Sequence, residues 1–229
     1  INAFRNFKLI KRVYNQLELD LTQKDYTDYP QLDITDFDYQ SFKFTDILTI
    51  KANKRNIHSL NLSYESRLFS NREQKDNKGG EIVGTEMIFN YIDLGYHFQY
   101  RANKRTRFEF NTGFTQRTDN GSGYYDSQKL IAELSSNYKW HKSSTLTFNY
   151  RYSDFAYLRE PEISQISNEE DFTSETKHVV KLASTTRLPK SWFKQANFEV
   201  KYNYTFADSN RQQYQYDRQI ISSGLRISF

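Results

Sequence analysis

Residues 196–207 read ANFEVKYNYTFA, and this stretch decides the fold. Its residues alternate between two faces, with Phe198, Val200, Tyr202, Tyr204 and Phe206 on one and Asn197, Glu199, Lys201, Asn203 and Thr205 on the other. A period of two over about eleven residues is typical of a β-strand and fits no helix. We therefore expect Glu199 and Lys201 to point away from the five apolar side chains.

The same alternation recurs along the chain and predicts ten strands, at residues 13–23, 39–51, 57–69, 86–100, 106–117, 127–140, 145–155, 176–188, 196–207 and 218–229. At a rise of about 3.3 Å per residue and a tilt of about 45°, strands of this length span about 25 Å, the height of the apolar band of a bilayer. Asp46 interrupts the apolar face between Phe44 and Leu48, and we expect a bulge or a register shift there.

Composition supports this interpretation and excludes several others. Mean hydropathy is −0.87, and the sequence contains no run of about 18 apolar residues, the length that a membrane helix needs. The chain has no cysteine, which excludes disulfides and thiolate metal sites. A net charge of +4, with bases alternating with acids, gives no stripe of one sign, so nucleic acid is not an expected partner. The rival fold is a soluble two-sheet sandwich, whose strands would be shorter.

The predicted connections alternate between short and long. The short ones are residues 52–56, 101–105, 141–144 and 189–195, and the long ones are residues 24–38, 70–85, 118–126, 156–175 and 208–217. The short turns carry bases and no acid, while 156–175 is acidic, although random loop charges would explain this as well. The repeat of KANKRN (51–56) in RANKRT (101–106) marks two equivalent turns. Short inner turns and long outer loops are typical of an antiparallel up-and-down transmembrane β-barrel.

The end of the sequence carries a resemblance. Ile221, Leu225, Ile227 and Phe229 share one face, and the last residue is aromatic. This resembles the final strand of Gram-negative outer-membrane β-barrel proteins. The resemblance implies an outer-membrane location, contact with lipid and lipopolysaccharide, and recognition of Leu225, Ile227 and Phe229 by the barrel-assembly machinery. Replacing Phe229 should then impair assembly more than replacing Ser228. Residues 208–218 also look like the last hairpin of barrels attached to repeat-containing export proteins.

We therefore expect an all-β barrel of about ten strands at residues 13–229, preceded by a periplasmic lead-in at residues 1–12. Its interior should hold a network of charged and polar side chains from Glu65, Arg67, Asp93, His97, Arg107, Glu109, Glu133, Lys139, Arg151, Arg187 and Arg226. These side chains should fill the lumen and leave little ion current. Aromatic belts are expected at Tyr100, Tyr138 and Trp140 near the short turns and at Tyr39, Tyr157 and Tyr204 near the long loops.

No catalytic, cofactor or metal site is expected. The four histidines, His58, His97, His141 and His178, lack the spacing of metal ligands. The expected function is that of a structural or partner-binding barrel in an outer-membrane assembly, with other outer-membrane or periplasmic subunits as partners. The alternative is a channel or export barrel that passes a solute or polymer, and an embedded enzyme ranks last. The substrate, and whether Ile1 is the mature N-terminus or a truncation, stay open.

Overall fold

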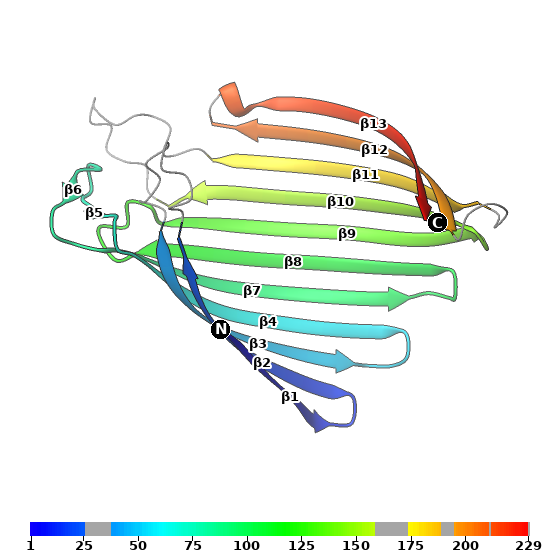
Figure 1. Cartoon of the computed structure of the whole chain (residues 1–229), viewed down its shortest axis with the longest axis horizontal. Coiled ribbons are helices and arrows are strands. Elements are labelled where there is room, and N and C mark those ends of the chain that lie inside the picture. Colours follow the sequence, from blue (N-terminus) through cyan, green and yellow to red (C-terminus); the bar gives the residue numbers. More distant parts are fainter. Residues whose placement is uncertain (26–37, 159–173, 189–194, 211, 229) are drawn as a thin grey trace.

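The computed structural model describes residues 1–25, 38–158, 174–188, 195–210 and 212–228 (Figure 1). These residues form an all-β protein with one short 3-10 turn, η3 (Gln212–Tyr214). The strands are β1 (Asn2–Ile10), β2 (Val13–Lys24), β3 (Tyr39–Lys51), β4 (Asn56–Phe69), β5 (Gln74–Lys75), β6 (Glu81–Ile82), β7 (Met87–Arg101), β8 (Thr106–Asp119), β9 (Ser127–His141), β10 (Ser144–Tyr157), β11 (Glu175–Arg187), β12 (Gln195–Ser209) and β13 (Tyr216–Ser228). Among the described residues, no helix is long and apolar enough to cross a membrane. Most of the predicted loops 24–38, 156–175 and 189–195 lies outside the described residues, as does Phe229.

All long strands join one sheet in the order in which they follow one another in the sequence. Every neighbouring pair is antiparallel, so the predicted up-and-down topology is confirmed. The ten predicted strands are all present, with ends within a few residues of those expected. The predicted count was wrong, because the sheet has eleven strands. The additional strand is β1, which lies within residues 1–12, the expected lead-in, and pairs with β2.

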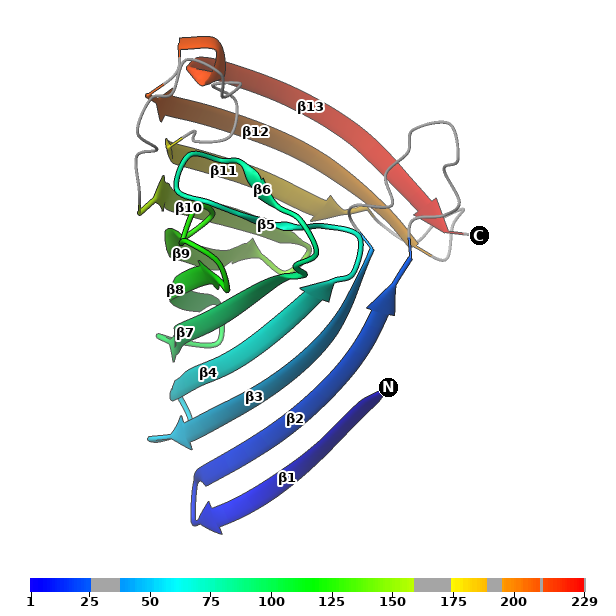
Figure 2. The same cartoon turned by 90° about the vertical axis from the view of Figure 1, so that its left-hand side faces the viewer.

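The sheet is curved but not closed, which corrects the expected barrel. β1 and β13 are its two edges, and Figures 1 and 2 show them at opposite sides of the arc. The alternating pattern specifies each strand and its neighbours through local contacts. Closure depends on the number of strands and on where the last meets the first, which no local pattern encodes. An open sheet encloses no lumen by itself, so the expectation that side chains fill one stays a prediction.

The register is regular through most of the sheet. Asp46 lies opposite Leu17 on one side and Leu62 on the other without any shift, so the bulge expected at this residue is absent. Irregularities lie instead beside two short turns, between Lys8 and Ile10 and between Ser144 and Leu146. The carboxylate of Asp46 therefore sits on the apolar face itself.

The two repeated turns are equivalent, as predicted. In each, an asparagine side chain accepts hydrogen bonds from two backbone amides: Asn53 from residues 55 and 56, and Asn103 from residues 105 and 106, at 2.7 and 2.9 Å in both cases. The turn between β1 and β2, which was not predicted, consists of Lys11 and Arg12 and is also basic. The Arg12 guanidinium donates to the carbonyl of Ala52 in the next turn, at 3.0 Å.

Candidate functional site

Cross-strand pairing divides the sheet into two faces. We call the face that carries Glu199 and Lys201 the polar face and the opposite one the apolar face. Paired residues of antiparallel strands share a face, and the register places the whole predicted network on the polar face: Glu65, Arg67, Asp93, His97, Arg107, Glu109, Glu133, Lys139, Arg151, Arg187 and Arg226. The role of these residues in a lumen stays a prediction.

The polar face is the inner side of the curve. Its polar side chains Thr45, Ser63, Glu65 and Ser135 are buried, whereas leucines of the apolar face, such as Leu60, are about half exposed. The segment between β4 and β7, which contains β5 and β6, lies over this face and within the arc in Figure 2. A concave polar face and a convex apolar face are the arrangement that a water-facing interior and a lipid-facing wall require.

Opposite charges pair along single strands of the polar face. Arg67 contacts Glu65 at 2.5 Å, Lys201 contacts Glu199 at 2.9 Å, and Arg107 pairs with Glu109. Each pair is two residues apart, so both side chains leave the strand on the same side. The alternation of acid and base in the sequence thus gives local neutralisation, as the sequence indicated.

Hydrogen bonds link the middle strands across the same face. Asp93 on β7 accepts from the hydroxyls of Ser63, at 3.0 Å, and Thr115, at 2.5 Å. His97 bonds to Asn111 at 2.5 Å, and Glu133 accepts from Asn149 at 2.7 Å. His97 therefore has an amide partner rather than a carboxylate, and no group of metal-ligating side chains occurs among the described residues.

At the long-loop end the polar face becomes aromatic and holds the buried core. Phe69, Met87, Phe89, Tyr124 and Tyr125 pack together there, and Met87 is fully buried. We call this group, together with Tyr39, Tyr91, Tyr157 and the three arginines that lie over the rings, the arginine–aromatic cluster. Arg67 lies over Tyr39 and Tyr91, Arg72 over Phe89 and Tyr125, and Arg117 over Phe89 and Tyr157, with distances from guanidinium carbon to ring centroid of 4.5 to 5.6 Å.

This cluster corrects the predicted outer belt at two of its three tyrosines, whereas the register places Tyr204 on the apolar face. Tyr39 and Tyr157 lie at the long-loop end, as expected, but on the polar face beneath arginines. Sequence reasoning missed the cluster because Arg72, Tyr124 and Tyr125 come from loops, where no period assigns a face. The guanidinium groups lie over the rings, and Arg117 also donates hydrogen bonds to the carbonyl of Tyr125 at 2.7 and 2.9 Å.

Two loops hold the cluster in place. The carboxylate of Asp119 accepts from the amides of Gly121 and Gly123, at 2.9 Å each, and from that of Tyr125, at 2.7 Å. Ser122 donates to the carbonyl of Lys75 at 2.9 Å, which joins this loop to the β5–β6 hairpin. The described loops at the long-loop end are therefore held by these hydrogen bonds, and they cover part of the concave face.

A polar cavity of about 870 Å³ lies on the polar face of β9, β10 and β11. Lys129, Arg151, Lys177 and Lys181 line it together with only two carboxylates, Glu133 and Glu175. Lys177 lies 3.7 Å from Glu175, and no ion pair among the described residues involves Arg151 or Lys181. The cavity is thus net positive and suits an anionic solute.

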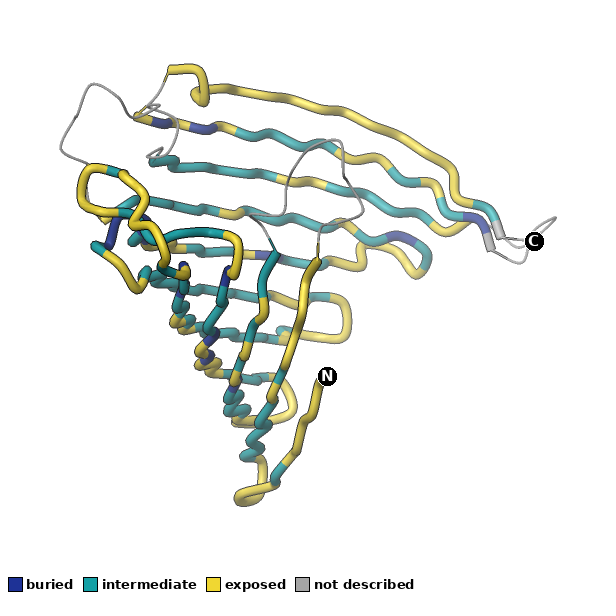
Figure 3. The backbone as a smooth tube through the Cα atoms, turned by 60° about the vertical axis from the view of Figure 1, so that its left-hand side comes forward, coloured by how far each residue is buried: buried dark blue, intermediate teal, exposed yellow. Residues whose placement is uncertain are grey.

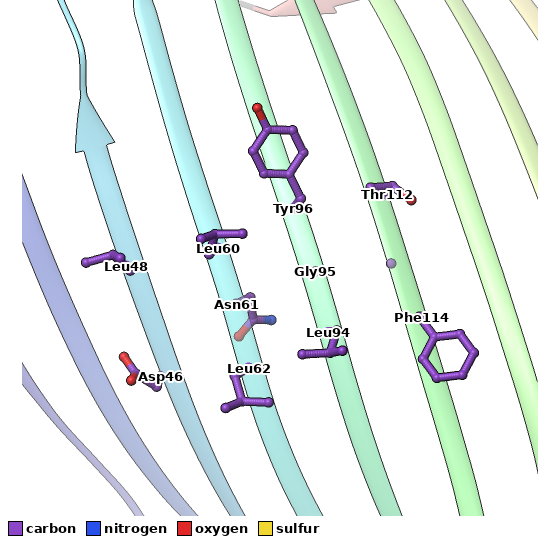
Figure 4. A pocket seen from close by; sticks show the side chains of 11 residues that line it. Asp46, Leu48, Leu60, Asn61, Leu62, Leu94, Gly95, Tyr96, Thr112 and Phe114 are labelled. Atoms are coloured by element: carbon purple, nitrogen blue, oxygen red, sulfur yellow. The ribbon is translucent and has the colours of Figure 1, made fainter.

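A second cavity, of about 480 Å³, lies on the apolar face (Figure 4). Leucines 48, 60, 62 and 94 line it with Phe114, and Asp46 stands at its side. Asp46 accepts a hydrogen bond from Asn15. An apolar depression on a convex wall suits a hydrocarbon chain rather than a polar reactant.

Sequence comparison finds no matching protein family and no similar curated protein. Among solved structures, the chain is similar to the ferric yersiniabactin uptake receptor FyuA from Yersinia pestis, with a TM-score of 0.49 and 8% identity over 99% of this chain and 40% of that one. It is also similar to a FadL homologue of Pseudomonas aeruginosa, with a TM-score of 0.34 and 8% identity over 98% of this chain and 75% of that one. The chain spans 40% of the length of the FyuA chain.

Proposed function

We propose that this chain forms the wall of an outer-membrane β-barrel and serves as a structural or partner-binding component of an outer-membrane assembly. The observation that carries the proposal is the apolar face. Large apolar side chains such as Leu62, Leu94 and Leu134 are 45 to 52% exposed there, on strand after strand. A soluble protein rarely exposes so large an apolar surface to water, whereas the surface of a protein that contacts lipid must be apolar.

The charge and the length of the connections between strands support one orientation of the sheet in the membrane. The described short turns carry Lys11, Arg12, Lys54, Arg55, Lys104, Arg105 and Lys142 without an acid, and the predicted connections at the other end are longer. Short turns face the periplasm in outer-membrane barrels. In this orientation the arginine–aromatic cluster lies on the concave face at the exterior end, where a partner subunit that enters the interior from outside would contact it.

Insertion can be tested with two neighbouring substitutions on β4. Leu62→Arg places a charge in the middle of the apolar face and should destabilise the inserted state by about 2–4 kcal/mol, because that side chain would face hydrocarbon. Asn61→Arg, one residue away on the polar face, should be tolerated. Heat-modifiable migration and protease protection in lipid vesicles measure both. Equal insertion of the two variants would contradict the membrane assignment.

The second candidate function is the passage of a solute or polymer. The net positive cavity of about 870 Å³ favours it, because a purely structural wall needs no excess of unpaired charge. In vesicles that carry the whole assembled protein, anionic solutes should pass faster than cationic ones of equal size. Arg151→Glu combined with Lys181→Glu should reverse that preference, and a matched pair at Lys54 and Lys104, in the turns, should leave it unchanged. An unchanged preference in the first variant would favour the structural role.

A further inference from the structure

We propose that β1 and β13 are interaction surfaces that pair with strands from polypeptide outside residues 1–229, and that these strands are odd in number. The inference rests on the membrane placement proposed above. The occupant is a complementary sheet whose two outer strands lie antiparallel to β1 and to β13. With it the concave polar face becomes the wall of a closed and wider barrel.

Both edges lack a neighbour on one side. β1 and β13 end the sheet, and the tube in Figure 3 is exposed along nearly the whole of each. Side chains on the apolar face of the edge are left bare: Ile221 on β13 is 77% exposed, whereas Val200 on β12 is 38% exposed. The difference corresponds to a missing strand beside β13.

Free edges are incompatible with lipid. About half of the backbone groups of an edge strand point outward, and hydrocarbon offers them no hydrogen-bond partner. Proteins that keep an edge free protect it with charges, proline or a bulge. β1 carries Arg5, Lys8 and a register shift between Lys8 and Ile10, so this argument concerns β13. Residues 219–225 of β13 read QIISSGL and contain no charge, proline or bulge, and the register of β13 with β12 is unbroken. The edge therefore has the properties of a strand that is paired in its working state.

The direction of the strands determines what can pair there. β1 runs toward the short turn at Lys11 and Arg12, and β13 runs from η3 at the long-loop end toward the same side as that turn. The two edges are therefore parallel to each other. Eleven consecutive antiparallel strands always end this way, so an antiparallel closure needs an odd number of added strands.

A second copy does not supply them. Two copies inserted in the same orientation present edges that all run the same way, so every junction between them would be parallel. The partner sheet needs the same alternation, with apolar residues beside Ile221 and Leu225. Beside Arg218 and Arg226 it should carry carboxylates, because β12 places only Thr205 and Asn197 opposite these two arginines.

Cysteine cross-linking tests whether the edges close on each other. The chain has no cysteine, so introduced pairs report without background. Lys201→Cys with Ser222→Cys joins direct partners on β12 and β13 and is the positive control. Asn6→Cys or Lys8→Cys with Ser222→Cys joins β1 to β13. In vesicles, under oxidant or a bismaleimide, we expect the control pair to cross-link within the monomer and the β1–β13 pairs not to do so. Cross-linking of β1 to β13 at the level of the control would overturn the proposal.

Photo-cross-linking in cells that produce the whole protein identifies the occupant. A benzophenone amino acid replaces Arg218 in one variant and Arg226 in another, and the cross-linked peptides are mapped. We expect both to reach one strand outside residues 1–229, in reverse order along that strand, as antiparallel pairing requires. Peptides from β1, or the same order along the partner, would refute the proposal. Wild-type chain that stays soluble and monomeric would instead refute the membrane placement.

Discussion

Single residues show what alternation specifies and what it does not. The period of two assigns Glu65 and Arg67 to one face, and their ion pair follows from the spacing. The rings that surround Arg67 come from Tyr39 and Tyr91 on neighbouring strands, and register, rather than sequence, brings them there. The sequence therefore predicts which face a residue lies on and which contacts it makes within its own strand. It does not predict the contacts with neighbouring strands.

Among the polar-face residues, Arg67 is the one whose replacement should lower the free energy of unfolding most. Arg67→Leu leaves the buried carboxylate of Glu65 without its cation, and we expect the free energy of unfolding in urea to fall by about 2 kcal/mol. Combining it with Glu65→Gln should recover part of the loss, because no unpaired charge remains. If the double variant were as unstable as the single one, the rings rather than the ion pair would explain the loss.

Asp46 is the residue that breaks the apolar face without breaking the sheet. Asn15 donates to its carboxylate, so the two polar groups satisfy each other on a surface proposed to meet lipid. Replacing both with leucine should stabilise the inserted protein by about 1–2 kcal/mol, since a buried polar pair is often no better than apolar side chains of similar size. Asn15→Leu alone should destabilise it, because the carboxylate then has no partner. Urea unfolding in vesicles measures both, and a destabilised double variant would mean that Asp46 has a partner other than lipid.

At the scale of elements, ten strands could be predicted because each is long and alternates clearly. β1 was missed because its sequence, NAFRNFKLI, places Phe4 on the polar face with Asn2 and Asn6, and a shift at Lys8 breaks the pattern. The β5–β6 hairpin was missed because its strands are two residues long. Pairing with a neighbour, rather than periodicity, makes these segments strands.

The β5–β6 hairpin approaches Tyr124 closely at Gly79, and a matched pair of glycines tests this contact. Gly79 and Gly84 both have positive φ, 83° and 79°, so alanine strains the backbone at either. At Gly79 a Cβ would also lie 2.7 Å from the hydroxyl oxygen of Tyr124, whereas at Gly84 nothing lies within 4 Å. Gly79→Ala should therefore release the hairpin, and trypsin should cleave after Lys78 several-fold faster than in Gly84→Ala. Equal cleavage would mean that backbone strain alone governs the hairpin.

At the scale of the whole molecule, the two faces of the wall could be predicted and its closure could not. Each strand carries the information for its own two faces and its two neighbours, so the order of the sheet follows from short connections. Neither Ile221 nor Leu225 reveals in the sequence whether a strand lies beside it. The structure shows this directly, because both side chains are exposed on a free edge.

Ion conduction provides the last prediction. The sequence predicted little current because bulky side chains would fill a ten-strand lumen, and the open sheet changes the reason but not the outcome. An arc whose edges stay apart encloses no path, so the purified 229-residue chain should give no discrete, stable single-channel current in planar bilayers. The whole assembled protein is the matched sample, and there the concave face with Arg151 and Lys181 should line a water-filled interior. A single reproducible conductance from the 229-residue chain as a monomer would show that eleven strands close without help, through a parallel seam between β1 and β13. It would also make passage of a solute the leading function of this chain by itself.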